Sequence, residues 1–417
     1  MSAAHLAEPS SRVQDTVAAC ERTNDASSYD EALKSIRDLQ LAVEKPGDFA
    51  ARIRFQAFQN IAILVLAEMG VLQVISGKAR AQLLRKNWLP RLDTMLHSSV
   101  WIFRCREKLW ADDPSTEQLM RLITASGMCE EVGMSTYRSN QMLEVLADPG
   151  QIAGQKFMLD VQFRTGSRIT DYLRAAQLDR CKTSNQSACQ FAFNGKTFWQ
   201  LLEESPERKA NFDLYMKAAR RGGQVQLWHQ RYPPAAKLRD ETLKKAPPAL
   251  LMVDVGGGVG GQVGAFRKQY PDLPGRCVLQ DLPETIKNNT SPLENVELMA
   301  YDFFTPQPLK GARIYLFRSV CHDWDDAHTR QLLSNTVAEM DPAYSRLLID
   351  EWVLPDVGVD LKAANMDVNM LLLFNGMERT ESQWVELLGD VGLEIVRIWR
   401  TEGAVESVIE TRVKRQM

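Results

Sequence analysis

Hydrophobic positions follow two different periods along this chain, and the change comes near residue 250. Beyond it, short apolar runs alternate with longer amphipathic stretches. The runs predict strands at 250–255, 277–281, 296–301, 314–320 and 346–353, and the stretches predict helices near 262–270, 283–289, 326–340 and 380–390. Alternation of this kind predicts an α/β fold with a parallel, doubly wound sheet. Two last strands, 393–400 and 405–413, flank Gly403 as an antiparallel hairpin at its edge.

Before residue 250 the spacing is helical. An apolar stripe predicts a first helix, made by Tyr29, Leu33, Ile36, Leu39 and Val43. Ser28 and Glu31 predict a capping box at its start, and Pro46-Gly47 predicts its end. A second helix, 49–69, is apolar on most faces, which indicates burial either in the core or in a subunit interface. The polar residues 1–26 predict a loose tail.

The middle of the chain holds further helical patterns. Residues 114–140 predict a small helix followed by a β wing around Gly133, as in a winged helix. Because no basic recognition helix is visible, we expect dimerisation or packing rather than DNA binding there. Residues 150–245 are helical throughout, and Ser205-Pro206-Glu207 begins one of these helices. Residues 80–113 follow neither period, which leaves an insertion and an error in the gene model both open.

Composition narrows the class of protein. The 417 residues are 45% hydrophobic and 25% charged with a net charge of −3, which is typical of a globular protein without a nucleic-acid partner. Seven cysteines without a C-x-x-C pair predict reduced thiols and a cytoplasmic location. We expect no signal peptide and no membrane segment, because no apolar run is long enough. The five histidines are too dispersed to predict a metal site.

A glycine-rich turn follows the first predicted strand of the sheet. Gly256, Gly258 and Gly261 satisfy G-x-G-x-x-G, with Asp281 about 20 residues on, which is typical of a dinucleotide site. The same segment also fits D-x-G-x-G-x-G, beginning at Asp254. That second pattern suits S-adenosylmethionine (SAM), since an acid at the end of a strand suits a cationic ligand. The turn alone leaves NAD and SAM both open.

The ends of the following strands carry acids and one histidine. Because parallel strands end at the same edge of a sheet, four acids and the histidine should converge there; they are Asp281, Asp302, His322, Glu351 and Glu378. Arg318 lies in the fourth predicted strand, and Asp323 directly follows His322. Asp281 would hold ribose hydroxyls, and Asp302 would accept from an adenine amino group with Phe303 packed on the ring. A histidine among carboxylates predicts a general base held in one tautomer. Asp323 also fits the cap of the next helix.

Six motifs in order give a more specific resemblance: Asp254-Val-Gly-Gly-Gly, Gln280-Asp-Leu-Pro283, Tyr301-Asp-Phe-Phe304, Cys321-His-Asp-Trp324, Asp350-Glu-Trp-Val-Leu-Pro355 and Glu378-Arg-Thr380. Residues 245–412 thereby resemble the SAM-dependent O-methyltransferases of the caffeic acid and flavonoid type. In detail they resemble the filamentous-fungal branch of that family, which acts on secondary metabolites. Residues 80–113 depart from the family pattern.

The resemblance implies roles for individual residues. SAM would be bound by Gly256, Gly258, Asp281, Leu282, Asp302 and Phe303. Arg318 would supply a cation near the cofactor, where the family usually has lysine. His322 would take the proton of the acceptor hydroxyl, and Glu351 and Glu378 would orient its ring.

The resemblance also implies three domains and a homodimer. An N-terminal helical, winged-helix-like dimerisation domain would span 1–150, a helical substrate-pocket and linker region 151–245, and a Rossmann-like SAM-binding domain 246–417. The predicted activity is methylation of a phenolic or enolic hydroxyl on a small aromatic or polyketide-like molecule. A pericyclase or cyclase that keeps SAM without methyl transfer, a non-catalytic SAM-binding protein and a NAD-dependent dehydrogenase are the alternatives.

Overall fold

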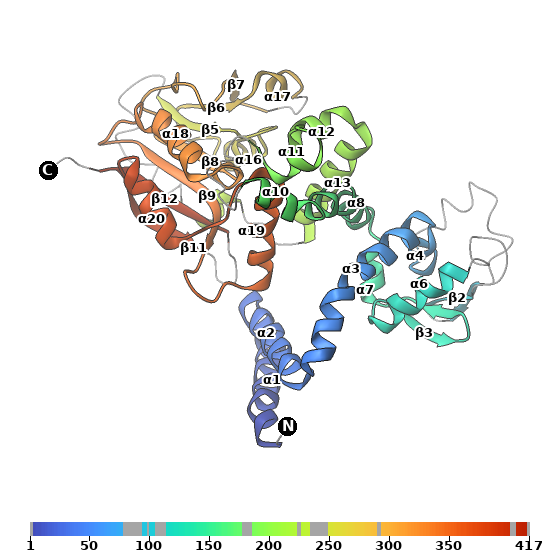
Figure 1. Cartoon of the computed structure of the whole chain (residues 1–417). Coiled ribbons are helices and arrows are strands. Elements are labelled where there is room, and N and C mark those ends of the chain that lie inside the picture. The colour runs from blue at the N-terminus through green and yellow to red at the C-terminus, as the bar shows by residue number, and fades with distance from the viewer. Residues whose placement is uncertain are drawn as a thin grey trace. The chain divides into compact units, whose positions relative to one another are not determined.

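The computed structural model describes residues 3–77, 94–97, 100–104, 114–176, 186–222, 227–233, 249–289, 293–400 and 406–414. These residues form two compact units (Figure 1). The first contains the described residues of Met1–Arg22, Glu31–Arg164 and Trp199–Val225, and the second those of Thr23–Asp30, Thr165–Phe198 and Gln226–Met417. Among the described helices, none combines the length and apolar character needed to cross a bilayer.

The first unit consists mostly of helices. They are α1 (Ala3–Thr23), most of α2 (Ala26–Val43), α3 (Pro46–Glu68), α4 (Val71–Ile75), α6 (Pro114–Ala125), α7 (Gln141–Leu146), α8 (Pro149–Phe157), a π-helical segment (Met158–Phe163), α12 (Phe198–Glu204) and α13 (Pro206–Gly222). Ala62, Ile63, Leu66 and Ala67 of α3 belong to the same buried cluster as Met120 and Ile123 of α6, and this cluster is the core of the unit.

A small antiparallel sheet completes this unit. Its strands are β1 (Thr94–His97), β2 (Val100–Arg104), β4 (Thr136–Arg138) and β3 (Glu130–Gly133), in that spatial order. The helix and wing predicted for 114–140 are therefore confirmed as α6, β3 and β4. Strands β1 and β2 fall inside 80–113, where no element was predicted, and the rest of that stretch lies outside the described residues.

Two predictions about the N-terminal helices are wrong. Most of the predicted loose tail, Ala3–Thr23, forms the helix α1, which packs on α2: the hydroxyls of Thr16 and Ser35 are 2.6 Å apart. The cap of α2 is Asp25, whose carboxylate accepts from the backbone N–H of Ser28 at 2.8 Å, so Ser28 lies within the first turn. Pro46 begins α3. Backbone N–H groups in the first turn of a helix have no partner within that helix, so a proline there costs no hydrogen bond.

The second unit is built on one mixed sheet, and the predicted doubly wound fold is confirmed. Its strands run in the order β11-β12-β9-β8-β5-β6-β7, with β10 paired to β9. They are β5 (Leu250–Val255), β6 (Arg276–Asp281), β7 (Val296–Ala300), β8 (Ile314–Arg318), β9 (Arg346–Leu354), β10 (Arg379–Thr380), β11 (Leu393–Arg400) and β12 (Glu406–Val413). Strands β5 to β10 pair in parallel, and β12 is antiparallel to both β9 and β11. The turn at Gly403 lies outside the described residues.

Helices cover both faces of this sheet (Figure 1). They include α14 (Trp228–Arg231), α16 (Gly261–Gln269), α17 (Pro283–Lys287), α18 (Asp326–Val337) and α20 (Glu381–Asp390). Side chains of α18 and α20 pack on one face of the sheet, and those of α14 and α16 pack on the other. Burial on both faces explains why the central strands β5, β8 and β9 read as apolar runs, whereas the edge strand β7 is partly exposed.

Four more helices of this unit or its border are α9 (Arg164–Gly166), α10 (Ile169–Ala175), α11 (Ala188–Ala192) and α19 (Leu361–Phe374). No helix was predicted for α19, although Asp360 caps its start by accepting from Ala363 N at 2.9 Å. Asn375, with φ at 60°, ends it in a left-handed conformation.

The strand order reverses at β5, which has β6 on one side and β8 on the other. In an open parallel sheet this switch point separates the loops at the carboxyl ends of two neighbouring strands, so a ligand can bind between them. The glycine turn follows β5 and the His322 segment follows β8. The topology therefore brings the two predicted parts of the site to neighbouring strand ends.

Candidate active site

The glycine turn is anchored on β6. The backbone N–H groups of Gly256 and Gly257 both donate to the carbonyl of Gln280, at 2.8 and 3.2 Å. Gly258 has φ at 61°, a conformation that side chains with a Cβ rarely adopt, and its N–H donates to Asp281 Oδ2 at 2.8 Å. The turn thus presents bare backbone beside the carboxylate of Asp281.

Asp254 lies beneath this turn. It is 1% exposed, and a Cβ on Gly257 would stand 2.6 Å from its carboxylate carbon. Burial raises the pKa of Asp254 to about 7. Neither carboxylate oxygen has a hydrogen-bond partner among the described residues. A buried acid of this kind fits a cationic ligand above the glycine turn, although its own side chain is closed to solvent.

The next two strand ends supply the other residues predicted to bind the cofactor. Leu282 is 51% exposed, and Asp302 is exposed while its Oδ1 accepts from Phe304 N at 3.0 Å. Phe303 reaches the glycine turn, since its Cε1 lies 3.5 Å from the position of a Cβ on Gly256. Two carboxylates, an exposed apolar side chain and an aromatic ring around one turn fit a nucleoside with a ribose diol and an adenine amino group.

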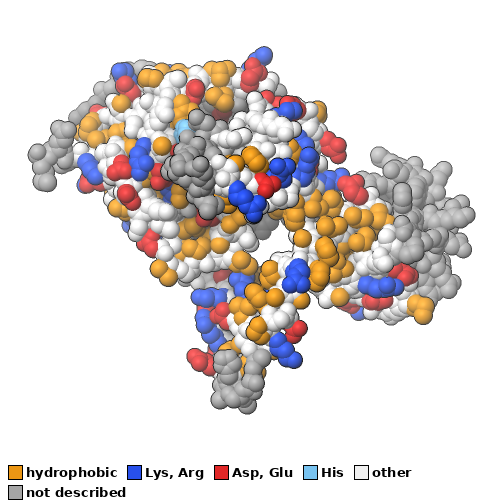
Figure 2. All heavy atoms as spheres, viewed as in Figure 1, with side chains coloured by type: hydrophobic (Ala, Val, Ile, Leu, Met, Phe, Trp, Pro, Cys, Tyr) orange, Lys and Arg blue, Asp and Glu red, His pale blue; other side chains and the backbone are white. Residues whose placement is uncertain are grey.

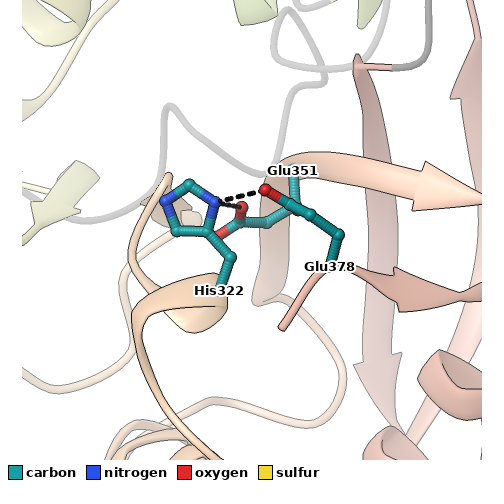
Figure 3. Close-up of side chains that lie close together, drawn as sticks. All are labelled: His322, Glu351 and Glu378. Carbon is teal, nitrogen blue, oxygen red and sulfur yellow. Dashed lines mark hydrogen bonds and ion pairs between the residues drawn. The ribbon is translucent and has the colours of Figure 1, made fainter. Parts of the chain in front are cut away.

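His322 lies in a short turn, Cys321–Asp323, directly after β8. Glu351 of β9 holds this turn, because its Oε1 accepts from the backbone N–H groups of Val320 and Cys321, each at 2.9 Å. Its other oxygen lies 3.5 Å from His322 Nδ1. Glu378 approaches the same nitrogen, with Oε1 at 2.9 Å, so both glutamates face one edge of the ring (Figure 3).

Charge around the ring strongly favours its protonated form. Burial lowers the pKa of His322, but Glu351, Asp323 and Glu378 outweigh burial and raise this pKa to about 10. Asp323 Oδ1 lies 3.6 Å from Nε2, on the opposite edge from the glutamates. Burial raises the pKa of Asp323 to about 7 although His322 opposes the shift, and burial likewise raises the pKa of Glu351.

Two residues without a predicted role fix the backbone of this turn. Gly376 is buried against His322, and a Cβ there would stand 2.0 Å from the carbonyl oxygen of His322. Arg379 is 1% exposed and donates to the carbonyls of Cys321 and Trp324 at 2.9 and 2.8 Å. Arg379 lies inside the Glu378-Arg-Thr380 motif, so the sequence contained its signal, whereas the approach of Gly376 to His322 depends on tertiary structure.

Arg318 is engaged by an acid instead of projecting as a lone cation. Its Nε donates to Asp350 Oδ2 at 3.0 Å, and Asp350 Oδ1 also accepts from Arg231 at 2.5 Å. Its positive charge still reaches the cofactor side, because it lowers the pKa of Asp254 against the larger effect of burial. The side chain remains 13% exposed.

One set of atoms in the described part of the chain has the spacing of a metal site. Nδ1 of His322 and one oxygen each of Glu351 and Glu378 all lie within 4.8 Å of one another. The same atoms are also explained without a metal, because a hydrogen on Nδ1 directly satisfies Glu378. The set is therefore suited first to proton chemistry at the ring.

Comparison with known sequences gives one family. A family model described as an O-methyltransferase domain matches residues 238–394. Methyltransferase cfoC of Aspergillus candidus is 34% identical over 304 residues, which cover 73% of this chain and 75% of that protein. Demethylsterigmatocystin 6-O-methyltransferase of Aspergillus parasiticus is 32% identical over 281 residues, covering 67% of this chain and 70% of that protein.

Solved structures share this fold over nearly the whole chain. OxaC in complex with SAH and oxaline matches with a TM-score of 0.78 and 25% identity, over 98% of this chain and 99% of that chain. A structure described as a pericyclic reaction enzyme matches with a TM-score of 0.76 and 25% identity, over 96% and 97%. Both similarities extend over nearly the whole chain.

Proposed function

Because this chain belongs to the family of SAM-dependent O-methyltransferases, we propose that it methylates a phenolic or enolic hydroxyl of a small secondary metabolite with His322 as general base. The observation that carries the proposal is the 2.9 Å contact between His322 Nδ1 and Glu378 Oε1. A carboxylate only accepts hydrogen bonds, so Nδ1 carries the hydrogen. Once the ring is neutral, Nε2 keeps a lone pair for an acceptor proton, and the raised pKa means that this neutral form becomes more populated as pH rises above neutrality.

The electrostatics of the site favour this proton transfer. A phenol has a pKa of about 10 and is a weak nucleophile at neutral pH. The carboxylates around His322 raise its pKa to about 10, so the ring and a phenol hold a proton about equally well. Matched pKa values make the transfer nearly balanced in free energy. Glu351 and Glu378 stabilise the imidazolium once the proton has moved.

The cofactor of the family is SAM, which supplies a methyl group already activated on a sulfonium. We propose that Gly256, Gly258, Asp281, Leu282, Asp302 and Phe303 bind it, with Asp254 and Arg318 setting the charge next to the glycine turn. The side chains of this chain then have two tasks, which are removing a proton and aligning the acceptor oxygen. Alignment of two reactants can contribute on the order of 7–11 kcal/mol.

Methyl transfer from labelled SAM to a panel of phenolic and enolic acceptors tests the proposal. We expect His322→Ala to lower the rate on the order of 100-fold or more, because a positioned base contributes that much. His328→Ala is the matched control, since His328 pairs with Asp325 at 2.8 Å but faces neither glutamate. Full methyl transfer by His322→Ala would show that another group is the base.

A pericyclic activity is the second candidate, because an enzyme of that kind shares this fold over nearly the whole chain. It would bind SAM without consuming it. Incubation of the acceptor panel with labelled SAM separates the two: a labelled product supports methyl transfer, whereas a rearranged product with intact SAM supports the alternative. A SAM-binding protein without activity would give neither product.

We also propose a homodimer, which apolar side chains on α3 support. Phe49, Ile53, Phe55, Phe58 and Ile61 are each more than 40% exposed in the single chain. Figure 2 shows hydrophobic side chains over this helix. Light scattering should give twice the 47.2 kDa mass of one chain, and Phe55→Glu with Phe58→Glu should halve it. A monomeric wild-type protein would refute the dimer.

A cytoplasmic location stays a prediction that fractionation of the source cells can test.

A further inference from the structure

The segment that follows α19, residues 376–378, contacts both the backbone of His322 and a side chain of α19. Gly376 lies against the carbonyl of His322, and the N–H of Met377 donates to the same oxygen at 2.9 Å. The next N–H, that of Glu378, donates in another direction, to Asp367 Oδ1 of α19 at 2.9 Å. Three consecutive residues therefore connect α19 with the turn that carries His322.

We propose that Asp367 is a positioning residue, which fixes the backbone of Glu378 so that its carboxylate stays on Nδ1 of His322. The proposal rests on the proposed role of His322 as general base. Asp367 does not contact the ring; it acts through Glu378. No motif singled it out, because its role depends on where α19 meets the segment before β10.

Glu378 depends on its backbone for its position. It is 2% exposed, so water does not replace a lost partner of its N–H. Its Oε2 has no hydrogen-bond partner in the described chain, which leaves His322 as the hydrogen-bond partner of its carboxylate through Oε1. Without an acceptor at position 367, the Glu378 peptide must rotate to find another partner. Because the side chain leaves from the same residue, this rotation moves the carboxylate away from the ring.

Moving the Glu378 carboxylate would change the negative charge around the His322 ring. Three acids face it: Asp323 from its own turn, Glu351 from β9 and Glu378 from the segment before β10. The nearby cation, Arg379, is committed to the carbonyls of Cys321 and Trp324 and to Asp326. Glu378 makes the closest contact of the three acids. Its displacement should therefore make His322 less basic, with Glu351 and Asp323 still in place.

Titration of His322 by NMR tests this in the full-length protein without any acceptor. The chain has five histidines, so labelled imidazole signals can be assigned by comparison with His322→Asn. We expect Asp367→Ala to lower the titration midpoint of His322 by about one pH unit or more, because a charge in contact is lost. Asp367→Asn keeps an amide oxygen that accepts from Glu378 N, so its midpoint should stay near the wild-type value.

Asp360→Ala is the matched control. Asp360 lies on the same helix and accepts a backbone N–H at the same 2.9 Å, from Ala363, but this bond is at the start of α19. We expect it to lower the melting temperature while leaving the His322 midpoint unchanged. An unchanged midpoint in Asp367→Ala, or an equal shift in Asp360→Ala or Asp367→Asn, would overturn the proposal. If Asp367→Ala does not fold, Asp367→Ser takes its place, because its hydroxyl is shorter than the carboxylate.

Activity gives a second readout. With saturating substrates, Asp367→Ala should lower kcat at least about 10-fold with an unchanged Kd for SAM, since the base is displaced and the cofactor site is not. A weaker SAM affinity with unchanged kcat would contradict a positioning role. The NMR arm also separates two failures. A wild-type protein that transfers no methyl group refutes the proposed function. A His322 titration midpoint that is the same in wild type and Asp367→Ala refutes this inference alone.

Discussion

Gly376→Ala tests how closely the base must be placed, because it adds a single methyl group. The new Cβ would stand 2.0 Å from the carbonyl oxygen of His322. A carbon and a carbonyl oxygen in contact need about 3.3 Å. The two segments must therefore separate by about 1.3 Å, which is the difference between these distances. Gly376 is not among the residues with positive φ, so the contact and not the backbone conformation sets the effect.

A displacement of about 1 Å at a catalytic group can lower a rate on the order of 100-fold, or about 2.7 kcal/mol of transition-state stabilisation. We expect that loss in kcat for Gly376→Ala, with a Kd for SAM within about twofold of wild type, measured by calorimetry. Overpacking should also lower the free energy of unfolding by about 1–3 kcal/mol. Gly166→Ala is the control, because its Cβ would meet no atom within 4 Å. A kcat for Gly376→Ala within threefold of wild type would refute the reasoning.

Four further predictions concern charged side chains. Because the pKa of His322 is raised to about 10, kcat/KM should rise with pH above neutrality, and Glu378→Gln should move this rise to lower pH; a curve that does not move excludes His322 as the titrating base. Protonated His322 also stabilises the folded protein. This stabilisation is complete below about pH 6.5, the ordinary pKa of a histidine, and is lost as pH rises toward 10, so the wild-type melting temperature should fall over that interval. Arg379→Met should lower kcat at least about 10-fold by freeing the carbonyls of Cys321 and Trp324, whereas Arg330→Met, at a partly exposed side chain, should leave kcat unchanged and alter the free energy of unfolding by less than about 0.5 kcal/mol. An equal loss of kcat in both variants would contradict a role of Arg379 at the turn. Asp281→Asn should weaken SAM binding about 10-fold by calorimetry, and unchanged binding would exclude Asp281 from the cofactor site.

The central strands β5, β8 and β9 were predictable because both of their faces are buried. Their apolar runs are therefore continuous, and turn residues mark their ends. Since parallel strands share one edge, the sequence also predicts that His322, Glu351 and Glu378 meet there. Helix α19 gave no such signal. Its second half, from Met370 to Phe374, is apolar all round, and nothing in that pattern distinguishes a helix from a strand.

Other details depend on contacts that spacing does not contain. Asp25 and Ser28 are both common capping residues three positions apart, and only the structure shows that Asp25 caps α2. Large apolar residues are few among residues 1–26, although Leu6, Val13, Val17 and Cys20 have helical spacing, and the polar composition led to the prediction of a tail. The helix that carries the apolar stripe from Tyr29 to Val43 was predicted correctly, but Tyr29 of this stripe is 55% exposed in the single chain. A sequence does not say whether such a stripe is covered by its own chain or by another.

The place of β12 in the sheet has a consequence for how the protein folds. It is the last described strand along the sequence, yet it lies between β11 and β9, where Ser407 pairs opposite Glu351. Until β12 has been synthesised and inserted, β9 has an open edge beside the glutamate that holds the His322 turn. Pairing between strands so distant in sequence is slow. We therefore expect activity to appear late in refolding, and chains interrupted before β12 to associate through the open edge of β9.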